Sequence, residues 1–145
     1  MIQVICPVCG AALEPQGTAW RCVQGHCFDV ARQGYVNLLT VTQKHSRHPG
    51  DTREMVAARR AFLDAGWYAP IAKTLADLVR RFCPEAASVL DAGCGEGYYL
   101  SQLGWVPERW GIDISRDAVR YAAARDRGAH WLTATAAHLP FADGG

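Results

Sequence analysis

The stretch that decides the fold is VLDAGCGEG, residues 89–97, where an apolar run meets an aspartate and then a glycine-rich turn. In this turn Gly93, Gly95 and Gly97 alternate with other residues, and residues 98–104 have the pattern of a helix. A glycine turn between a strand and a helix lets the backbone approach a ligand closely, because glycine has no Cβ. The glycine spacing by itself is weak evidence, so the flanking sequence must decide what the turn does.

Apolar strand patterns alternate with helical patterns around and after this turn. The predicted strands are 87–93, 109–115 and 130–136, and the predicted helices are 98–104 and 116–128. Asp113 lies near the end of the second strand, sixteen residues past Gly97. This alternation is typical of an α/β fold with a doubly wound parallel sheet. Three strands are few for such a sheet, so we expect the sequence to be the front part of a longer protein.

Two other interpretations of the glycine turn stay open. A nicotinamide-binding fold also places glycines after its first strand and an acid after its second, but its G-x-G-x-x-G fingerprint would need a glycine where Tyr98 stands. The other interpretation is a strand, turn and helix with a purely structural role. Cys94 lies inside the turn without a basic neighbour in the sequence, so we interpret it as a small packing residue rather than a nucleophile.

A second motif lies near the N-terminus, where Cys6, Cys9, Cys22 and His26 follow the pattern C-x2-C-x12-C-x3-H. Two such knuckles joined by a short hairpin can place four ligands at the corners of a tetrahedron, as structural zinc requires. Cys27 competes with His26 as the fourth ligand. A redox pair or a set of ordinary buried thiols is the alternative without metal. Because a closed site with four ligands leaves no position for a substrate, we predict a structural role for the metal.

The composition is that of an ordinary globular protein: 50% of the 145 residues are hydrophobic, and 15 Lys and Arg residues balance 14 Asp and Glu residues to a net charge of +1. The charge is unevenly spread, since residues 20–60 contain seven cations and three anions. This excess predicts either a surface that faces nucleic acid or a solvated polar linker. The sequence shows neither a signal-peptide pattern nor a long apolar run, so we expect a cytoplasmic protein without a membrane partner.

Two amphipathic helices are predicted between the cysteine motif and the glycine turn, at residues 52–66 and 68–82. Asp51 or Thr52 can cap the first of them. Residues 29–39 have no regular pattern, and a polar linker with a Pro-Gly breaker follows them. We therefore expect three parts: a zinc-binding module at 1–40, a linker with helices at 41–84, and the N-terminal half of a cofactor-binding domain at 85–145.

The last of these parts resembles the S-adenosylmethionine site of Rossmann-like methyltransferases. The features that carry the resemblance are Asp91 before the glycine turn, Asp113 after the second strand, and the Leu-Pro-Phe turn at 139–141. The resemblance implies that the glycine turn passes under the methionine part of the cofactor and that Asp113 accepts hydrogen bonds from both ribose hydroxyls. It also implies that Thr135 faces the adenine, at a position where many relatives carry Asp.

The two motifs together resemble the 23S ribosomal RNA (guanine-N1)-methyltransferases, over essentially the whole sequence. The matching stretches are CPVCG, GHCFDVARQGYVNLL, SRHPGDTREMVAARRAFLDAGWYAP and VLDAGCGEGYY. In this family three cysteines and a histidine bind zinc, and they correspond here to Cys6, Cys9, Cys22 and His26. The resemblance also implies a set of cofactor-binding residues: Tyr68, Asp91, Gly93, Gly95, Glu96, Gly97, Asp113 and Thr135.

The activity that the resemblance implies is transfer of a methyl group from S-adenosylmethionine to N1 of a guanine in a 23S rRNA hairpin. The zinc module and the basic segment would hold the RNA phosphates. The cations concerned are Arg21, Arg32, Lys44, Arg47 and Arg53. Contacts to the target base are expected beyond Gly145, so the sequence names no catalytic base. A homodimer is a further expectation, and a zinc-ribbon RNA-binding protein without catalysis is the alternative function.

Overall fold

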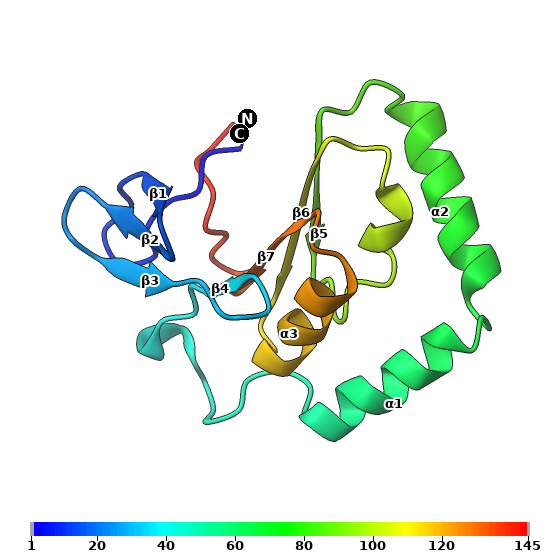
Figure 1. The fold of residues 1–145 in the computed structure, drawn as a ribbon, viewed down its shortest axis with the longest axis horizontal. Coiled ribbons are helices and arrows are strands. Elements are labelled where there is room, and N and C mark those ends of the chain that lie inside the picture. The colour runs from blue at the N-terminus through cyan, green and yellow to red at the C-terminus, as the bar shows by residue number, and fades with distance from the viewer. Residues whose placement is uncertain (1, 145) are drawn as a thin grey trace.

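The computed structural model describes residues 2–144 and contains two β-sheets (Figure 1). The first is antiparallel and consists, in spatial order, of β1 (Leu13–Gln16), β2 (Ala19–Cys22) and β3 (Cys27–Asp29). The strands of the second are β4 (Tyr35–Asn37), β5 (Ser88–Ala92), β6 (Glu108–Asp113) and β7 (His130–Thr133). All pairs in this sheet are parallel, and its order is β4-β7-β6-β5. The predicted α/β fold with a parallel sheet is confirmed.

The described residues form three α-helices: α1 (Arg53–Asp64), α2 (Ala69–Phe82) and α3 (Arg116–Arg125). Two short 3-10 helices accompany them, η1 (Val41–Gln43) and η2 (Leu100–Leu103). Thr52 caps α1, because its hydroxyl accepts a hydrogen bond from Met55 N at 3.3 Å. Ser115 caps α3 in the same way through Ala118 N, at 3.2 Å. The helices predicted around these caps are therefore confirmed, with ends that differ by a few residues.

The helix predicted at 98–104 is the short η2 instead of an α-helix. In an α-helix the carbonyl of Tyr98 would accept from the backbone of Gln102, but Gln102 N donates to Tyr99 O at 3.1 Å. The Tyr98 carbonyl is taken by side chains, since Ser101 Oγ donates to it at 2.7 Å and Gln102 Nε2 at 3.4 Å. Such local side-chain bonds compete with helix formation, and Gly104 ends the segment after one turn.

The expectation of irregular structure at 29–39 is wrong for Tyr35–Asn37, which form β4. β4 pairs in parallel with β7, with Tyr35 opposite Trp131 and Val36 opposite Leu132. A strand of three residues that pairs with a distant strand leaves almost no local pattern in the sequence. The consequence is structural: the chain that leaves the small antiparallel sheet becomes the edge of the large parallel one.

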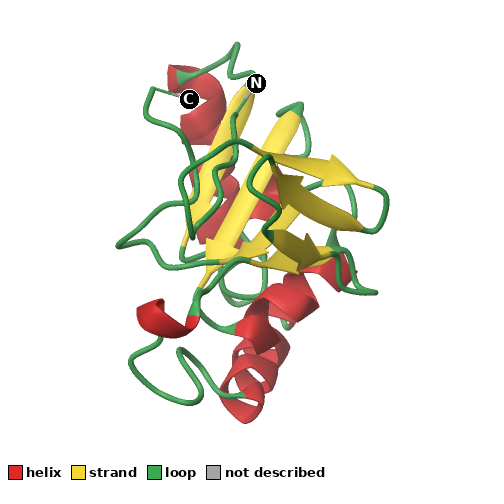
Figure 2. Ribbon diagram, turned by 90° about the vertical axis from the view of Figure 1, so that its left-hand side faces the viewer, coloured by secondary structure: helices red, strands yellow, loops and turns green. Residues whose placement is uncertain are grey.

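The parallel sheet is covered on both faces, by helices on one side and by the small sheet on the other (Figures 1 and 2). On the helical face, Trp131 of β7 packs in one buried cluster with Val119 of α3. On the opposite face, Ile112 and Leu132 share a buried cluster with Leu13 of the N-terminal module. Alternate residues of each strand face opposite sides, so β7 can contribute Trp131 to one core and Leu132 to the other.

The apolar stripe predicted for α2 lies largely in solvent. Ile71, Leu75, Leu78 and Phe82 are 42% to 71% exposed, and Ala72 is the buried residue of this helix. The periodicity of the sequence correctly predicts the helix, but most of its apolar face makes no core in the described structure. No helix within residues 2–144 is long and apolar enough to cross a membrane.

Candidate functional site

The glycine turn is fixed to the end of β6 by backbone hydrogen bonds. Gly93 N and Cys94 N both donate to Ile112 O, at 2.8 and 2.9 Å. Gly95 N donates to Asp113 Oδ2 at 3.0 Å, and Ser115 N donates to Asp113 Oδ1 at 2.8 Å. The Asp113 carboxylate therefore joins the turn to the start of α3, at the carboxyl ends of β5 and β6, which is where open parallel sheets bind ligands.

The three glycines of the turn have left-handed backbone conformations, with φ of 89° at Gly93, 57° at Gly95 and 83° at Gly97. Their surroundings differ. A Cβ on Gly93 or Gly95 would meet nothing within 4 Å, so the backbone there faces open space. A Cβ on Gly97 would lie 2.7 Å from the Trp131 ring. Gly93 and Gly95 are thus available to a ligand, whereas Gly97 is needed for packing against the sheet.

Two carboxylates lie at this turn, and they affect one another. Burial, followed by the nearby charge of Asp113, raises the pKa of Asp91 above its usual value. Burial also raises the pKa of the Cys94 thiol, and the charges of Asp113 and Asp91 add to that effect. Cys94 is therefore a neutral thiol, in agreement with its interpretation as a packing residue rather than a nucleophile. The site as a whole carries negative charge.

Glu96 is buried under the turn, with 2% of its side chain exposed. Its Oε2 accepts a hydrogen bond from Arg125 Nη2 at 2.5 Å, and the same nitrogen lies 2.8 Å from Asp64 Oδ1. The sequence predicts Glu96 as a cofactor contact but gives no signal for Arg125, because the two are 29 positions apart. In the structure Glu96 and Arg125 hold the turn to the last turn of α3.

Two predicted cofactor residues lie on other segments. Tyr68 precedes α2, is 41% exposed, and packs edge-to-face on Phe62 with 5.0 Å between ring centroids. It also lies near Tyr99, whose pKa is raised first by burial and then by Tyr68. Thr135 follows β7, one residue after Ala134, whose backbone N donates to Asp113 O at 3.0 Å. Both residues are therefore placed close to the segments that form the turn.

The structure brings Cys6, Cys9, Cys22 and His26 together, with all four potential ligand atoms within 4.8 Å of one another. Cys9 Sγ and Cys22 Sγ are 3.7 Å apart, and Cys22 Sγ lies 3.4 Å from His26 Nδ1. For zinc bound to sulfur at about 2.3 Å, two ligands of a regular tetrahedron would be roughly 3.8 Å apart. Three cysteines and one histidine in this arrangement fit a zinc ion.

The position of Cys27 favours His26 as the fourth ligand. Cys27 is exposed and lies outside the group of four, while His26 belongs to it. Burial opposes ionisation of Cys22, but hydrogen bonds from the backbone of His26 and Gln24 lower the pKa of its thiol to about 6. Cys22 therefore favours the thiolate form, which is the form that binds metal.

Comparison with known families finds matches in both halves of the chain. Residues 4–47 match the family described as "RlmA, N-terminal", and residues 89–145 match the family described as "Methyltransferase domain". The chain is 42% identical to the 23S rRNA (guanine(748)-N(1))-methyltransferase of Streptomyces fradiae, over 96% of this chain and 51% of that protein. It is 41% identical to a Micromonospora griseorubida protein named as a 23S rRNA (guanine-N(1)-)-methyltransferase, over 95% of this chain and 53% of that one.

The chain therefore spans about half the length of these relatives. Among solved structures, Streptomyces venezuelae DesVI overlaps 59% of this chain and 36% of its own, with 29% sequence identity and a TM-score of 0.46.

Proposed function

We propose that this chain, which matches the N-terminal half of the 23S rRNA (guanine-N1)-methyltransferases, binds S-adenosylmethionine at its glycine turn. The observation that carries the proposal is the pair of carboxylates, Asp91 and Asp113, beside a turn whose Gly93 and Gly95 face open space. Two carboxylates favour a ligand with positive charge, and the sulfonium of this cofactor carries one. The same charges disfavour the pyrophosphate of a nicotinamide cofactor.

Each binding residue has a separate task in this proposal. Asp113 accepts one hydrogen bond at each oxygen within the protein, and a carboxylate has about four lone-pair sites, so two remain for ribose hydroxyls. Gly93 and Gly95 offer the backbone against which the methionine part lies. Tyr68 and Thr135 complete the site from α2 and from the segment after β7. Glu96 and Gly97 maintain the shape of the turn.

The group of Cys6, Cys9, Cys22 and His26 holds a structural zinc ion in this proposal. Four protein ligands close the coordination sphere, so the metal takes no part in methyl transfer. The donor set supports zinc, because thiolate and imidazole are the ligands that structural zinc sites use. A zinc ion here would fold the N-terminal module, whose three short strands bury few side chains of their own.

For the complete protein, the reaction we propose is methylation of guanine N1 in a 23S rRNA hairpin in the cytoplasm. When bound, S-adenosylmethionine would supply the methyl group, and the electron pair of the broken bond would stay on its sulfur as the bond to N1 forms. The proton of N1 must leave in the same process, so the base must be held with N1 in line with the methyl group. The part of this chain is to bind the cofactor and to fix its orientation.

Calorimetric titration of S-adenosylmethionine into the zinc-loaded chain tests the proposal, with NAD as the control ligand. We expect saturable binding of S-adenosylmethionine alone, and a loss of about tenfold or more in affinity for Asp113→Ala, because the ribose contacts and the link to Gly95 are removed. Asp77→Ala, on the exposed side of α2, is the matched control and should bind like the wild type. Binding of NAD instead, or equal affinity in Asp113→Ala, would contradict the proposal.

A further inference from the structure

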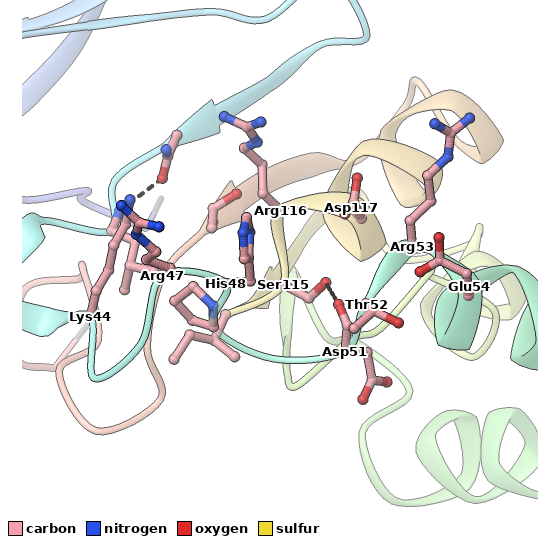
Figure 3. Close-up of a pocket in the computed structure, with 15 residues that line it drawn as sticks. Lys44, Arg47, His48, Asp51, Thr52, Arg53, Glu54, Ser115, Arg116 and Asp117 are labelled. Atoms are coloured by element: carbon pink, nitrogen blue, oxygen red, sulfur yellow. Dashed lines mark hydrogen bonds between the residues drawn. The ribbon is translucent and has the colours of Figure 1, made fainter.

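A cavity of about 560 Å³ lies between the segment 44–54 and the start of α3 (Figure 3). Four cationic side chains line it, and they are Lys44, Arg47, Arg53 and Arg116. None of the four has an ion-pair partner within residues 2–144. Side chains that are far apart in the sequence thus bring unpaired positive charge to one hollow.

The acidic residues of the lining do not cancel this charge. Asp51 pairs with Arg59 at 2.5 Å, and Asp117 lies 3.9 Å from Arg120, and neither arginine belongs to the cavity. Glu54 is the remaining acid of the lining. Against these four cations, Glu54 is the one lining carboxylate without an ion-pair partner among residues 2–144, so positive charge is in excess, which suits an anionic ligand.

Two of the cations occupy positions that are unfavourable without an anion. Arg53 is the first residue of α1 and Arg116 is the first residue of α3. The start of a helix carries partial positive charge, so a cation there is repelled, and an anion is attracted by both the helix and the arginine. Both helix starts are held in place, because Ser115 Oγ donates to Asp51 O at 2.8 Å.

We propose that this cavity binds a backbone phosphate of the RNA substrate. The inference rests on the proposed function, since that function supplies the RNA. A backbone phosphate fits better than a small free anion, because the long side chains of Lys44, Arg47 and Arg116 are exposed and can reach a strand that passes over the opening. The cavity adjoins Asp113 through Ser115, so a phosphate here would fix the RNA next to the cofactor.

The test compares RNA binding and cofactor binding in the same variants of the zinc-loaded chain. A fluorescein-labelled RNA hairpin is titrated at several salt concentrations. For Arg47→Gln with Arg116→Gln we expect about tenfold weaker RNA binding and a salt slope reduced by about 1, as for loss of one phosphate contact. The matched control, Arg80→Gln with Arg81→Gln, removes two exposed cations from α2 and should change the RNA affinity less. S-adenosylmethionine affinity should be the same in all of them.

The other outcomes separate the inference from the proposed function. If the pocket variants weaken S-adenosylmethionine and leave RNA unaffected, the cavity belongs to the cofactor site and the inference is overturned. If inorganic phosphate raises the Tm of the wild type while the substitutions at Arg47 and Arg116 leave RNA affinity unchanged, the cavity binds free phosphate and the RNA assignment is overturned. If the wild type fails to bind S-adenosylmethionine, the proposed function falls, while the salt slopes still report on the cavity.

Discussion

At the scale of single residues, the two carboxylates beside the glycine turn differ in how well the folded chain stabilises their charge. Asp113 is satisfied by two backbone donors, whereas Asp91 has no hydrogen bond of its side chain among those of the described residues. Burial and the charge of Asp113 raise the pKa of Asp91, so its ionised form is disfavoured in the folded chain. A buried carboxylate whose charge is disfavoured is often functional, because a neutral residue at the same position would make the fold more stable.

Asp91→Asn should therefore stabilise the free chain at pH 7 and weaken its affinity for S-adenosylmethionine. The folded pKa of Asp91 is raised above the unfolded value of about 3.9, so its charge costs stability above the folded pKa. This cost disappears as the pH falls through the folded pKa toward the unfolded one. We expect a Tm higher by a few degrees at pH 7, at roughly 2–4 °C per kcal/mol, and no difference near pH 4.

Thermal unfolding followed by circular dichroism from pH 4 to pH 8 measures this difference. Asp77→Asn is the control, since Asp77 is exposed in an ion pair with Lys73 and its loss should have little effect. A variant at position 91 that is less stable than the wild type at pH 7 would show that the carboxylate is stabilised by its surroundings, contrary to this argument.

At the scale of elements, Arg125 connects three of them. It lies in the last turn of α3, contacts Asp64 in the last turn of α1, and reaches Glu96 in the glycine turn. Its guanidinium also lies over the Tyr98 ring, 5.8 Å from the centroid. Arg125 therefore positions the turn through Glu96, while the backbone of Gly93 and Gly95 stays open.

Replacing Arg125 with Met should leave the buried Glu96 carboxylate without a partner. We expect a loss of roughly 2–3 kcal/mol in the free energy of unfolding, because an uncompensated buried charge is costly. The double variant Arg125→Met with Glu96→Gln should recover at least half of that loss, since no charge is then left unpaired. Urea denaturation at pH 7 measures both variants against the wild type. No recovery in the double variant would mean that the contact of Arg125 with Asp64 or Tyr98 is the stabilising one.

Helices and strands differ in how far the sequence alone predicts them. Strands β5, β6 and β7 and helices α1, α2 and α3 were predictable, because caps, glycines and apolar patterns within each segment determine them. β4 and the pairing of Glu96 with Arg125 were not, since both depend on contacts between distant residues. The cysteine spacing left His26 and Cys27 as alternatives, and the family resemblance implied His26. The structure places His26 with the three cysteines and Cys27 outside them.

At the scale of the whole molecule, the N-terminal module and the parallel sheet share one hydrophobic core. Trp20 of β2 packs edge-to-face on Trp110 of β6, with ring centroids 6.2 Å apart. The chain ends also lie side by side (Figure 1), where Ile5 N donates to Pro140 O at 2.9 Å. Unfolding of the module would therefore expose the face of the sheet that carries Ile112 and Leu132, next to Asp113 at the end of β6.

Removal of zinc should for this reason disturb the sheet as well as the module. Cys9→Ser removes one ligand, and we expect loss of the bound zinc, a decrease of several kcal/mol in stability, and faster amide exchange in β6 and β7. Apparent zinc-binding free energies of small zinc modules are roughly 10–16 kcal/mol, so the effect should be large. Cys27→Ser is the matched control, because Cys27 is exposed and outside the ligand group.

Zinc content by mass spectrometry and hydrogen exchange of the same samples measure both effects together. If zinc were lost from Cys9→Ser while β6 and β7 kept their protection, the module and the sheet would be independent units in spite of the shared core. If Cys27→Ser lost its zinc instead, the ligand set would have to include Cys27. The expected pattern, with both changes in Cys9→Ser and neither in Cys27→Ser, follows from one core in which Cys6 and Cys22 pack with Ile112 and Leu132.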